Sequence, residues 1–249
     1  MQPHLQLHKG SGELLSKPTT YRRLIGRLLY LAHSRLEIAY AVRTPSQFLD
    51  DITNEHMLAG LHVLKFLKNN PSQGLFFSLS SPLTLKGFSD SDWGACPYTR
   101  RSTTGFCFFL GTSLISWKSN KHTVLSRSSY EVEYRALAQA TYEGQWLLYL
   151  LQDFLISRPT PVILYCDNKS TLHIDANLVF HERSKHIEIY CHVVRDRVQV
   201  GVNHLLLVSS KEQVADILTK ILHPGPFNTL QSKIGTIHIY CSLKGTVKA

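Results

Sequence analysis

Four acidic residues that lie far apart in the sequence stand where their carboxylates could act together. Asp90 ends a predicted strand, Glu133 lies in the first turns of a long predicted helix, and Asp167 directly follows another predicted strand. Asp216 falls in the first turn of the last predicted helix. Strand ends and helix starts on one side of an open sheet face the same crevice. We therefore expect the four side chains to converge there.

Carboxylates that converge repel one another unless a cation neutralises them. Ligands that are all oxygen favour Mg²⁺, with Mn²⁺ as a substitute, over zinc. Two such ions, roughly 3.5–4 Å apart, clamp the attacking and leaving oxygens of a phosphodiester. The pattern thus predicts two-metal phosphodiester hydrolysis, with Asp90, Glu133, Asp167 and Asp216 as both the catalytic and the metal-binding residues.

Each of these residues also has an ordinary structural interpretation. Asp90 and Asp92 stand beside serines and a glycine and could be turn residues. Glu133 and Asp216 near helix starts could favour the helix dipole, and Asp167 could be a helix cap. Only the joint placement of the four favours catalysis over these alternatives.

The elements that would position these residues form an α/β pattern. Strands are predicted at 83–90, 104–110, 113–119, 162–166 and 203–208, and helices at 129–154, 170–176, 182–200 and 213–221. Three consecutive strands followed by alternating helices and strands indicate a mixed five-stranded sheet. Its first three strands should be antiparallel and the later ones parallel, with helices on both faces.

The chain before this sheet is predicted to be helical. Apolar periodicity indicates helices near 19–32 and 53–68, and the segment Asn69–Gly74 should end the second one. From Pro224 onward the helical pattern is lost. We therefore expect a small helical segment at 1–78, an α/β domain at 79–222, and a loosely ordered tail at 223–249.

The formal charge of +9 favours a nucleic-acid partner. Ser91 and Asn168 could contact 2′-hydroxyl groups of RNA. Six basic residues could follow phosphates, or could form an ordinary solvated face: Lys118, Lys121, Arg183, Lys185, His186 and Arg195. The five cysteines are unclustered, and no apolar run is long enough to span a membrane. We expect reduced thiols, no membrane partner, no targeting signal and no small-molecule cofactor.

Seven ordered motifs around these residues resemble the ribonuclease H domain of copia-type retrotransposon Pol polyproteins. The motifs are Phe88–Trp93, Arg100–Phe106, Trp117–Ser119, Ser126–Tyr134, Tyr165–Asn168, His181–Ile189 and Val214–Lys220. Upstream, Tyr21–Leu31 and Val63–Lys68 resemble the C-terminal (connection or thumb) end of the family's reverse transcriptase.

The resemblance implies a ribonuclease H-like fold and an endonuclease that cuts the RNA strand of RNA–DNA hybrids. Its four carboxylates carry over to Asp90, Glu133, Asp167 and Asp216, with Asp92 and Glu131 as lower-ranked neighbours. The implied partners are the hybrid and the reverse transcriptase portion of the same polyprotein. The implied location is intracellular, in a cytoplasmic virus-like particle or in the nucleus.

Other functions fit the sequence less well. The aspartate pair of a polymerase palm is missing, because Leu49-Asp50-Asp51 lies in a polar stretch that we interpret as a solvated turn, so no polymerase is expected. A transposase or integrase would need a glutamate about thirty-five residues beyond Asp167, on the last helix. That position is Val202, and the next glutamate, Glu212, precedes the helix. The alternative kept open is a non-catalytic, nucleic-acid-binding scaffold left by a decayed retroelement.

Overall fold

The computed structural model describes residues 7–10, 12–156, 161–169 and 185–238, with the side chains of 185–187 left out. The chain divides into two compact units. One unit combines residues 1–76 with 221–249, and the other is Phe77–Lys220. The predicted helix at 170–176 lies outside the described residues.

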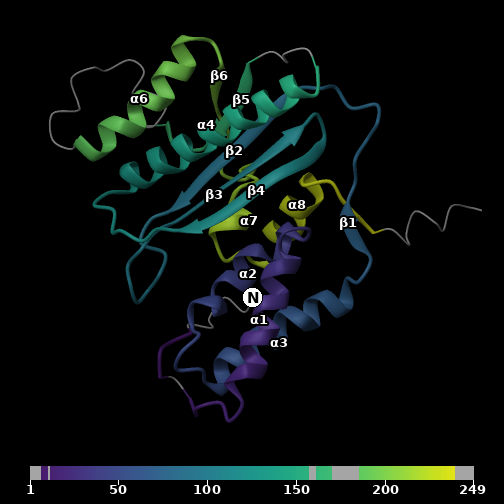
Figure 1. The fold of residues 1–249 in the computed structure, drawn as a ribbon, viewed down its shortest axis with the longest axis vertical. Helices are drawn as coiled ribbons and strands as arrows, with labels where there is room; N and C mark the ends of the chain where they lie inside the picture. The colour runs from purple at the N-terminus through teal and green to yellow at the C-terminus, as the bar shows by residue number, and fades with distance from the viewer. Residues whose placement is uncertain (1–6, 11, 157–160, 170–184, 239–249) are drawn as a thin grey trace, which may run out of the picture. The chain divides into compact units, whose positions relative to one another are not determined.

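The Phe77–Lys220 unit is built on a five-stranded sheet (Figure 1). Its strands are β2 (Leu85–Asp92), β3 (Thr103–Leu110), β4 (Ser113–Lys121), β5 (Val162–Cys166) and β6 (Asn203–Leu207), in the spatial order β4-β3-β2-β5-β6. Strands β2, β3 and β4 are antiparallel, and β5 and β6 are added in parallel. This order confirms the predicted ribonuclease H-like mixed sheet.

Helices cover both faces of this sheet. The long α4 (Ser129–Asp153) and α6 (Lys185–Gln199) pack together, and Phe106 and Phe108 of β3 join their core. The short α7 (Asp216–Thr219) instead contacts β3 at Gly105. Successive strand residues point to opposite faces, so α7 lies on the face opposite α4. The side chains on one face of the sheet thus pack against α4 and α6, and the residues on the other face lie against α7.

The unit that combines residues 1–76 with 221–249 is called the N-terminal unit below. Its first segment contains the two predicted helices and three short ones. These are α1 (Pro18–Leu31), η1 (Leu36–Ile38), α2 (Ala39–Arg43), η2 (Pro45–Gln47) and α3 (Asn54–Asn69). Thr53 caps α3 in a capping box that His56 completes through its Nδ1 atom. Tyr21, Ile25 and Val42 form the centre of the core of this unit.

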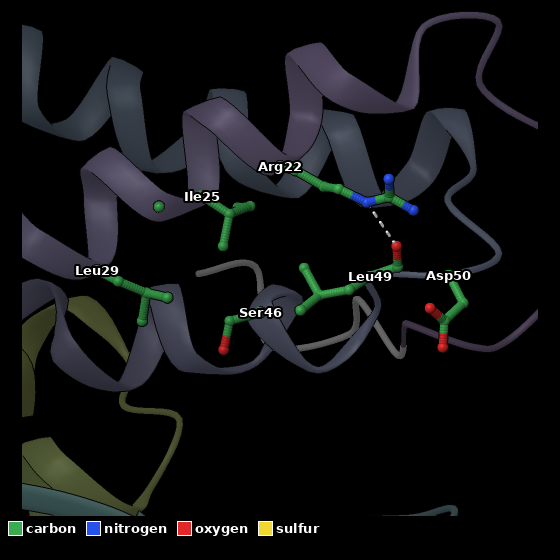
Figure 2. Close-up of a pocket in the computed structure, with 7 residues that line it drawn as sticks. Arg22, Ile25, Leu29, Ser46, Leu49 and Asp50 are labelled. Carbon is green, nitrogen blue, oxygen red and sulfur yellow. Dashed lines mark hydrogen bonds between the residues drawn. The ribbon is translucent and has the colours of Figure 1, made fainter.

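A pocket of about 310 Å³ lies in the N-terminal unit, and Figure 2 shows its lining. The Arg22 Nε atom of α1 donates a hydrogen bond to the Leu49 carbonyl oxygen across 2.9 Å. Leu49, Asp50 and Asp51 are exposed at a bend before α3. The structure therefore agrees with the interpretation of this acidic pair as a solvated turn.

The segment after Pro224 differs from the expected loosely ordered tail. Residues 224–233 form α8 (Pro224–Lys233), and β7 (Thr236–His238) pairs antiparallel with β1 (Gln73–Leu75). Leu230 and Ile234 are buried, and Phe227 packs edge-on against Phe66. The prolines that suggested a break start this helix, because proline is tolerated in the first helical turn. None of the described helices is long and apolar enough to cross a membrane.

Candidate active site

Three of the four predicted carboxylates meet at the end of the central strands. Asp90 of β2, Glu133 of α4 and Asp167 after β5 each offer an oxygen atom, and these three oxygens lie within 4.8 Å of one another. Ligand oxygens on opposite sides of a Mg²⁺ ion are about 4.2 Å apart, given Mg–O distances near 2.1 Å. The 4.8 Å limit is slightly larger than this span, so a small adjustment of the side chains would let the three oxygens share one divalent cation.

The register of the sheet explains why Asp90 and Asp167 are level. Strands β2 and β5 run parallel, with Phe88 opposite Tyr165, and their rings stack at 4.9 Å between centroids. Each aspartate comes two residues after its ring. Two steps along parallel strands cover the same distance and return to the same face. The two carboxylates are thus brought together by strand pairing that the core fixes.

The start of α4 separates the roles of its two glutamates. The Ser128 hydroxyl caps the helix by accepting a hydrogen bond from the Glu131 backbone N–H at 3.2 Å. The Glu131 carboxylate accepts hydrogen bonds from the Arg127 backbone N–H at 2.8 Å and from the Arg135 guanidinium at 2.7 Å. Glu131 therefore secures the helix start, and Glu133 is the glutamate that reaches the other carboxylates.

Burial makes the carboxylate cluster costly to ionise. Asp90 is only 1% exposed. Burial raises the pKa of Asp90 well above its usual range; Lys220 opposes the shift, and Asp216 and Glu133 add to it. Burial likewise raises the pKa of Glu133 to about 7, against a hydrogen bond with Ser91. A divalent cation between the carboxylates would remove this penalty.

Asp216 is linked to the cluster through Asp90 and Lys220. The Lys220 ammonium donates to Asp90 Oδ1 at 3.1 Å and to Asp216 Oδ1 at 2.8 Å. The Thr219 hydroxyl donates to Asp90 Oδ2. Burial raises the pKa of Asp216, and the ion pair with Lys220 opposes that shift. Asp216 thus stands beside the three clustered carboxylates, with an ammonium group between it and Asp90.

Two residues of the loop before α7 support the cluster, and the sequence analysis did not single them out. The Ser210 hydroxyl donates to Asp167 Oδ2 at 3.0 Å. The Gln213 side-chain amide donates to the Ser89 carbonyl oxygen at 2.9 Å and so ties the loop to β2. Lys220 was also missed, although its spacing of four residues from Asp216 on one helix face was a usable signal.

Gly105 permits the close approach of α7 to the sheet. It stands opposite Asp90 in the β2–β3 pairing. A Cβ atom at this position would lie 2.7 Å from Leu218 Cβ and 2.9 Å from Thr219 Cγ2, closer than real Cβ atoms come. The glycine of the Arg100–Phe106 motif therefore lets Thr219 and Lys220 reach Asp90.

The predicted nucleic-acid contacts fall in different environments. Ser91 is buried beside Glu133, and Asn168 is half-buried directly after Asp167. Lys118 is exposed on β4. The Lys121 ammonium is within hydrogen-bonding distance of the Cys96 sulfur, at 2.9 Å.

The remaining basic residues lie in or before α6. Arg195 is half-buried, and its charge acts on the hydroxyls of Tyr130 and Tyr134 of α4. Arg183 lies outside the described residues, as do the side chains of Lys185 and His186. Asp92, the lower-ranked neighbour of Asp90, is half-buried, and burial raises its pKa. It is not among the three clustered ligands.

Comparison with known proteins finds similar sequences in transposon polyproteins. No protein-family model matches it. The retrovirus-related Pol polyprotein from transposon RE1 of Arabidopsis thaliana is 40% identical over 239 residues, which are 96% of this chain and 16% of that protein. The polyprotein from transposon RE2 of the same plant is 39% identical over 246 residues, which are 99% of this chain and 17% of that protein.

Among solved structures, the N-terminal RNase H domain of rv2228c from Mycobacterium tuberculosis aligns with 60% of this chain and 97% of that one, at a TM-score of 0.41 and 10% identity. The chain spans about one sixth of the length of the two curated relatives. Their similarity extends over almost all of its residues. Almost the whole chain is therefore similar to one part of the retrovirus-related Pol polyproteins of transposons, the family that its sequence motifs resemble.

Proposed function

We propose that the Phe77–Lys220 unit hydrolyses the RNA strand of RNA–DNA hybrids, with two Mg²⁺ ions held by Asp90, Glu133, Asp167 and Asp216. The observation that carries the proposal is the meeting of three ligand oxygens within 4.8 Å. Its position supports it further, because this crevice lies at the carboxyl ends of parallel strands, where open sheets bind ligands. Similarity to the Pol polyprotein family supplies the substrate class.

The side chains of the cluster divide the work of binding and orientation. When bound, the two ions activate the attacking water and stabilise the departing oxygen. Glu133 and Asp167 hold one side of the site, Asp216 holds the other, and Asp90 lies between them and serves both. The Ser210 hydroxyl orients Asp167 through its hydrogen bond. The chain's main contribution is therefore a fixed arrangement of oxygens.

Recognition of the hybrid is assigned to groups around this cluster. Ser91 is engaged with Glu133, so we assign it to positioning that glutamate. Asn168 then becomes the nearest candidate for a 2′-hydroxyl contact, which is how proteins distinguish RNA from DNA. Exposed Lys118 is the best candidate for phosphate contact among the described residues. Arg195 is half-buried near two tyrosines, which favours a structural role for it.

The N-terminal helices are assigned by resemblance to the end of the reverse transcriptase region. We propose that residues 1–78 belong to that region and that the nuclease acts together with the polymerase portion of the polyprotein. A nuclease at the rear of a polymerase would remove the RNA template strand after it has been copied. The full chain should accordingly bind hybrid more tightly than single-stranded RNA of equal length.

The decisive experiment follows a labelled RNA strand annealed to DNA. With Mg²⁺, the purified chain should cut the RNA and leave the DNA intact, and Asp167→Asn should abolish the cleavage. Asp196→Asn is the matched control, because it removes one negative charge from an exposed position of α6 in the same unit. It should cut at the wild-type rate.

Two outcomes separate the enzyme from the scaffold alternative. Cleavage that needs a divalent ion and disappears with Asp167→Asn supports the proposed nuclease. Wild-type protein that binds the hybrid but never cuts it, at any Mg²⁺ or Mn²⁺ concentration, would instead establish a nucleic-acid-binding scaffold.

A further inference from the structure

Lys220 occupies one side of the carboxylate cluster. It directly follows α7, and its ammonium lies 3.1 Å from Asp90 Oδ1 and 2.8 Å from Asp216 Oδ1. The side chain of Asp90 is 1% exposed and that of Asp216 is 11% exposed, whereas that of Lys220 is 35% exposed. The Lys220 side chain is therefore partly exposed to solvent, and its ammonium bridges two carboxylates that are largely buried.

Asp90 consequently faces two cation positions at once. On one side it shares the 4.8 Å cluster with Glu133 and Asp167. On the other side it shares the ammonium of Lys220 with Asp216. Among the described residues, no lysine or arginine forms an ion pair with Glu133 or Asp167, and Lys220 acts on Glu133 only through its charge. This side is therefore the one left for a divalent ion.

Charge balance makes the two positions unequal. The four carboxylates carry a formal charge of −4, and Lys220 reduces it to −3. One divalent ion then leaves −1, and a second ion added beside the ammonium would give +1. With Lys220 removed, the same two ions would bring the charge to −2 and then to 0. The charge count alone penalises both ions by the same amount, but repulsion grows as the distance shortens. Because the ammonium lies against Asp90 and Asp216, it disfavours an ion on that side more than one held by Glu133 and Asp167.

We infer that Lys220 is an internal counter-cation that occupies the Asp90–Asp216 side of the site. The first divalent ion then binds tightly at Asp90, Glu133 and Asp167. A second ion binds between Asp90 and Asp216 only when the Lys220 side chain rotates away from them. The inference rests on the proposed function in so far as it assigns these carboxylates to metal binding. Lys220 is accordingly a positioning residue. It keeps Asp90 and Asp216 aligned while that side holds no ion.

The side chain of Lys220 is suited to such an exchange. It is a compact charge on a flexible four-carbon stem, so it can leave without disturbing α7. The Thr219 hydroxyl remains on Asp90 Oδ2 and keeps that carboxylate in place. Entry of the second ion thus requires one partly exposed side chain to rotate, and no core contact to break.

The test is a Mn²⁺ titration of the full chain. Calorimetry measures the heat of binding, and electron paramagnetic resonance measures the concentration of free Mn²⁺. Wild-type protein should bind one ion tightly and a second at least tenfold more weakly. Lys220→Met should tighten the second ion at least tenfold, and Lys220→Arg should restore the unequal pattern because it returns the charge. Equal affinity of the second ion in wild type and Lys220→Met overturns the inference.

A second measurement needs no variant and keeps the inference testable if Lys220→Met does not fold. In ¹⁵N-labelled wild-type protein, Mg²⁺ should leave the hydrogen-bonded lysine ammonium signal unchanged during the first equivalent and remove it during the second. Loss of that signal with the first equivalent would contradict the proposed order of filling.

The outcomes distinguish this inference from the proposed nuclease, because neither measurement uses nucleic acid. Unequal Mn²⁺ binding without cleavage of hybrid would support the role of Lys220 and refute the nuclease. Cleavage together with two equal Mn²⁺ sites would do the reverse.

Discussion

Replacement of Gly105 by alanine tests whether the approach of α7 to the sheet builds the site. The added Cβ atom would lie 2.7 Å from Leu218 Cβ, and ordinary contacts begin at 3.4 Å, so α7 must retreat by about 0.7 Å or more. Overpacking of this kind costs about 1–3 kcal/mol of folding free energy. The retreat also stretches the contacts of Thr219 and Lys220 with Asp90.

The consequence for activity should exceed the consequence for stability. Displacement of catalytic groups by about 1 Å can reduce a rate by about 100-fold. We therefore expect Gly105→Ala to remain folded at 25 °C, to unfold at lower urea concentration than wild type, and to cut hybrid about 100-fold more slowly. Circular dichroism during urea unfolding and a gel assay of labelled RNA measure the two effects.

The control is the same substitution where space is open. A Cβ atom at Gly26 of α1 would meet nothing within 4 Å. Gly26→Ala should therefore stabilise its helix by about 0.5–1 kcal/mol and leave cleavage unchanged. If Gly105→Ala unfolds at the same urea concentration as wild type and cuts the hybrid at the same rate, the proposed role of this glycine in positioning α7 is wrong.

Three further predictions concern other parts of the chain. Burial raises the pKa of Cys96, but hydrogen bonds from Lys121 and Thr99 outweigh this effect and lower the pKa to about 7. The rate of Cys96 alkylation, measured by peptide mass spectrometry, should therefore reach half its maximum near pH 7. An alkylation rate that rises only above pH 8 would refute this prediction. Burial lowers the pKa of His56 below its ordinary 6.5, against the opposing effects of His8 and Glu55, so the folded state keeps the ring neutral. The stability that this neutral ring contributes is complete above pH 6.5 and should be lost as the pH falls below that value. His56→Gln keeps a capping box without a titrating ring, so its free energy of unfolding in urea should change less between pH 7.5 and 5.5 than that of wild type. Equal changes in the two proteins would contradict the assignment. Leu230 is 4% exposed, so Leu230→Ala should cost about 2–5 kcal/mol in urea unfolding, whereas a loosely ordered tail would lose nothing.

The sheet could be predicted closely because its strands carry local signals. Val162–Cys166 is an apolar, β-branched run behind two prolines, and the structure has β5 over the same residues. Gly111, at φ 61°, makes the tight turn between β3 and β4, the two strands predicted on either side of it. Such elements are specified by residues next to one another in the chain, so periodicity alone located them.

Elements that depend on distant contacts were predicted less well. The helix expected at 213–221 is only Asp216–Thr219, because the Gln213 side chain bonds to Ser89 and to the Ala215 backbone instead of continuing a helix. The helix at Pro224–Lys233 was missed because its stability comes from the burial of Leu230 and from the contact of Phe227 with the distant Phe66. Neither contact is visible from neighbouring residues.

The candidate site shows the same division. Strand ends predicted the placement of Asp90 and Asp167, since parallel pairing follows from the α/β pattern. The choice of Glu133 over Glu131 came from family resemblance, and the ion pair of Glu131 with Arg135 supplies its physical reason. Lys220 could not be placed, because its contact with Asp90 requires α7 to settle against Gly105.

The arrangement of donors behind the carboxylates favours a site built for cations over a chance meeting of acids. Each carboxylate has a hydrogen-bond donor: Ser91 for Glu133, Ser210 for Asp167, Thr219 for Asp90, and Lys220 for both Asp216 and Asp90. Three of these partners are neutral hydroxyls, which orient a carboxylate without neutralising it. A cluster selected only for stability would gain more from three ammonium or guanidinium groups, because buried charges that stay unneutralised are costly. Hydroxyl donors leave the negative charge available, and in metal sites such outer partners fix the orientation of the ligands. The Asp90–Glu133–Asp167 side therefore has the charge and the support of a pre-organised divalent site, and only the Asp216 side carries a built-in cation.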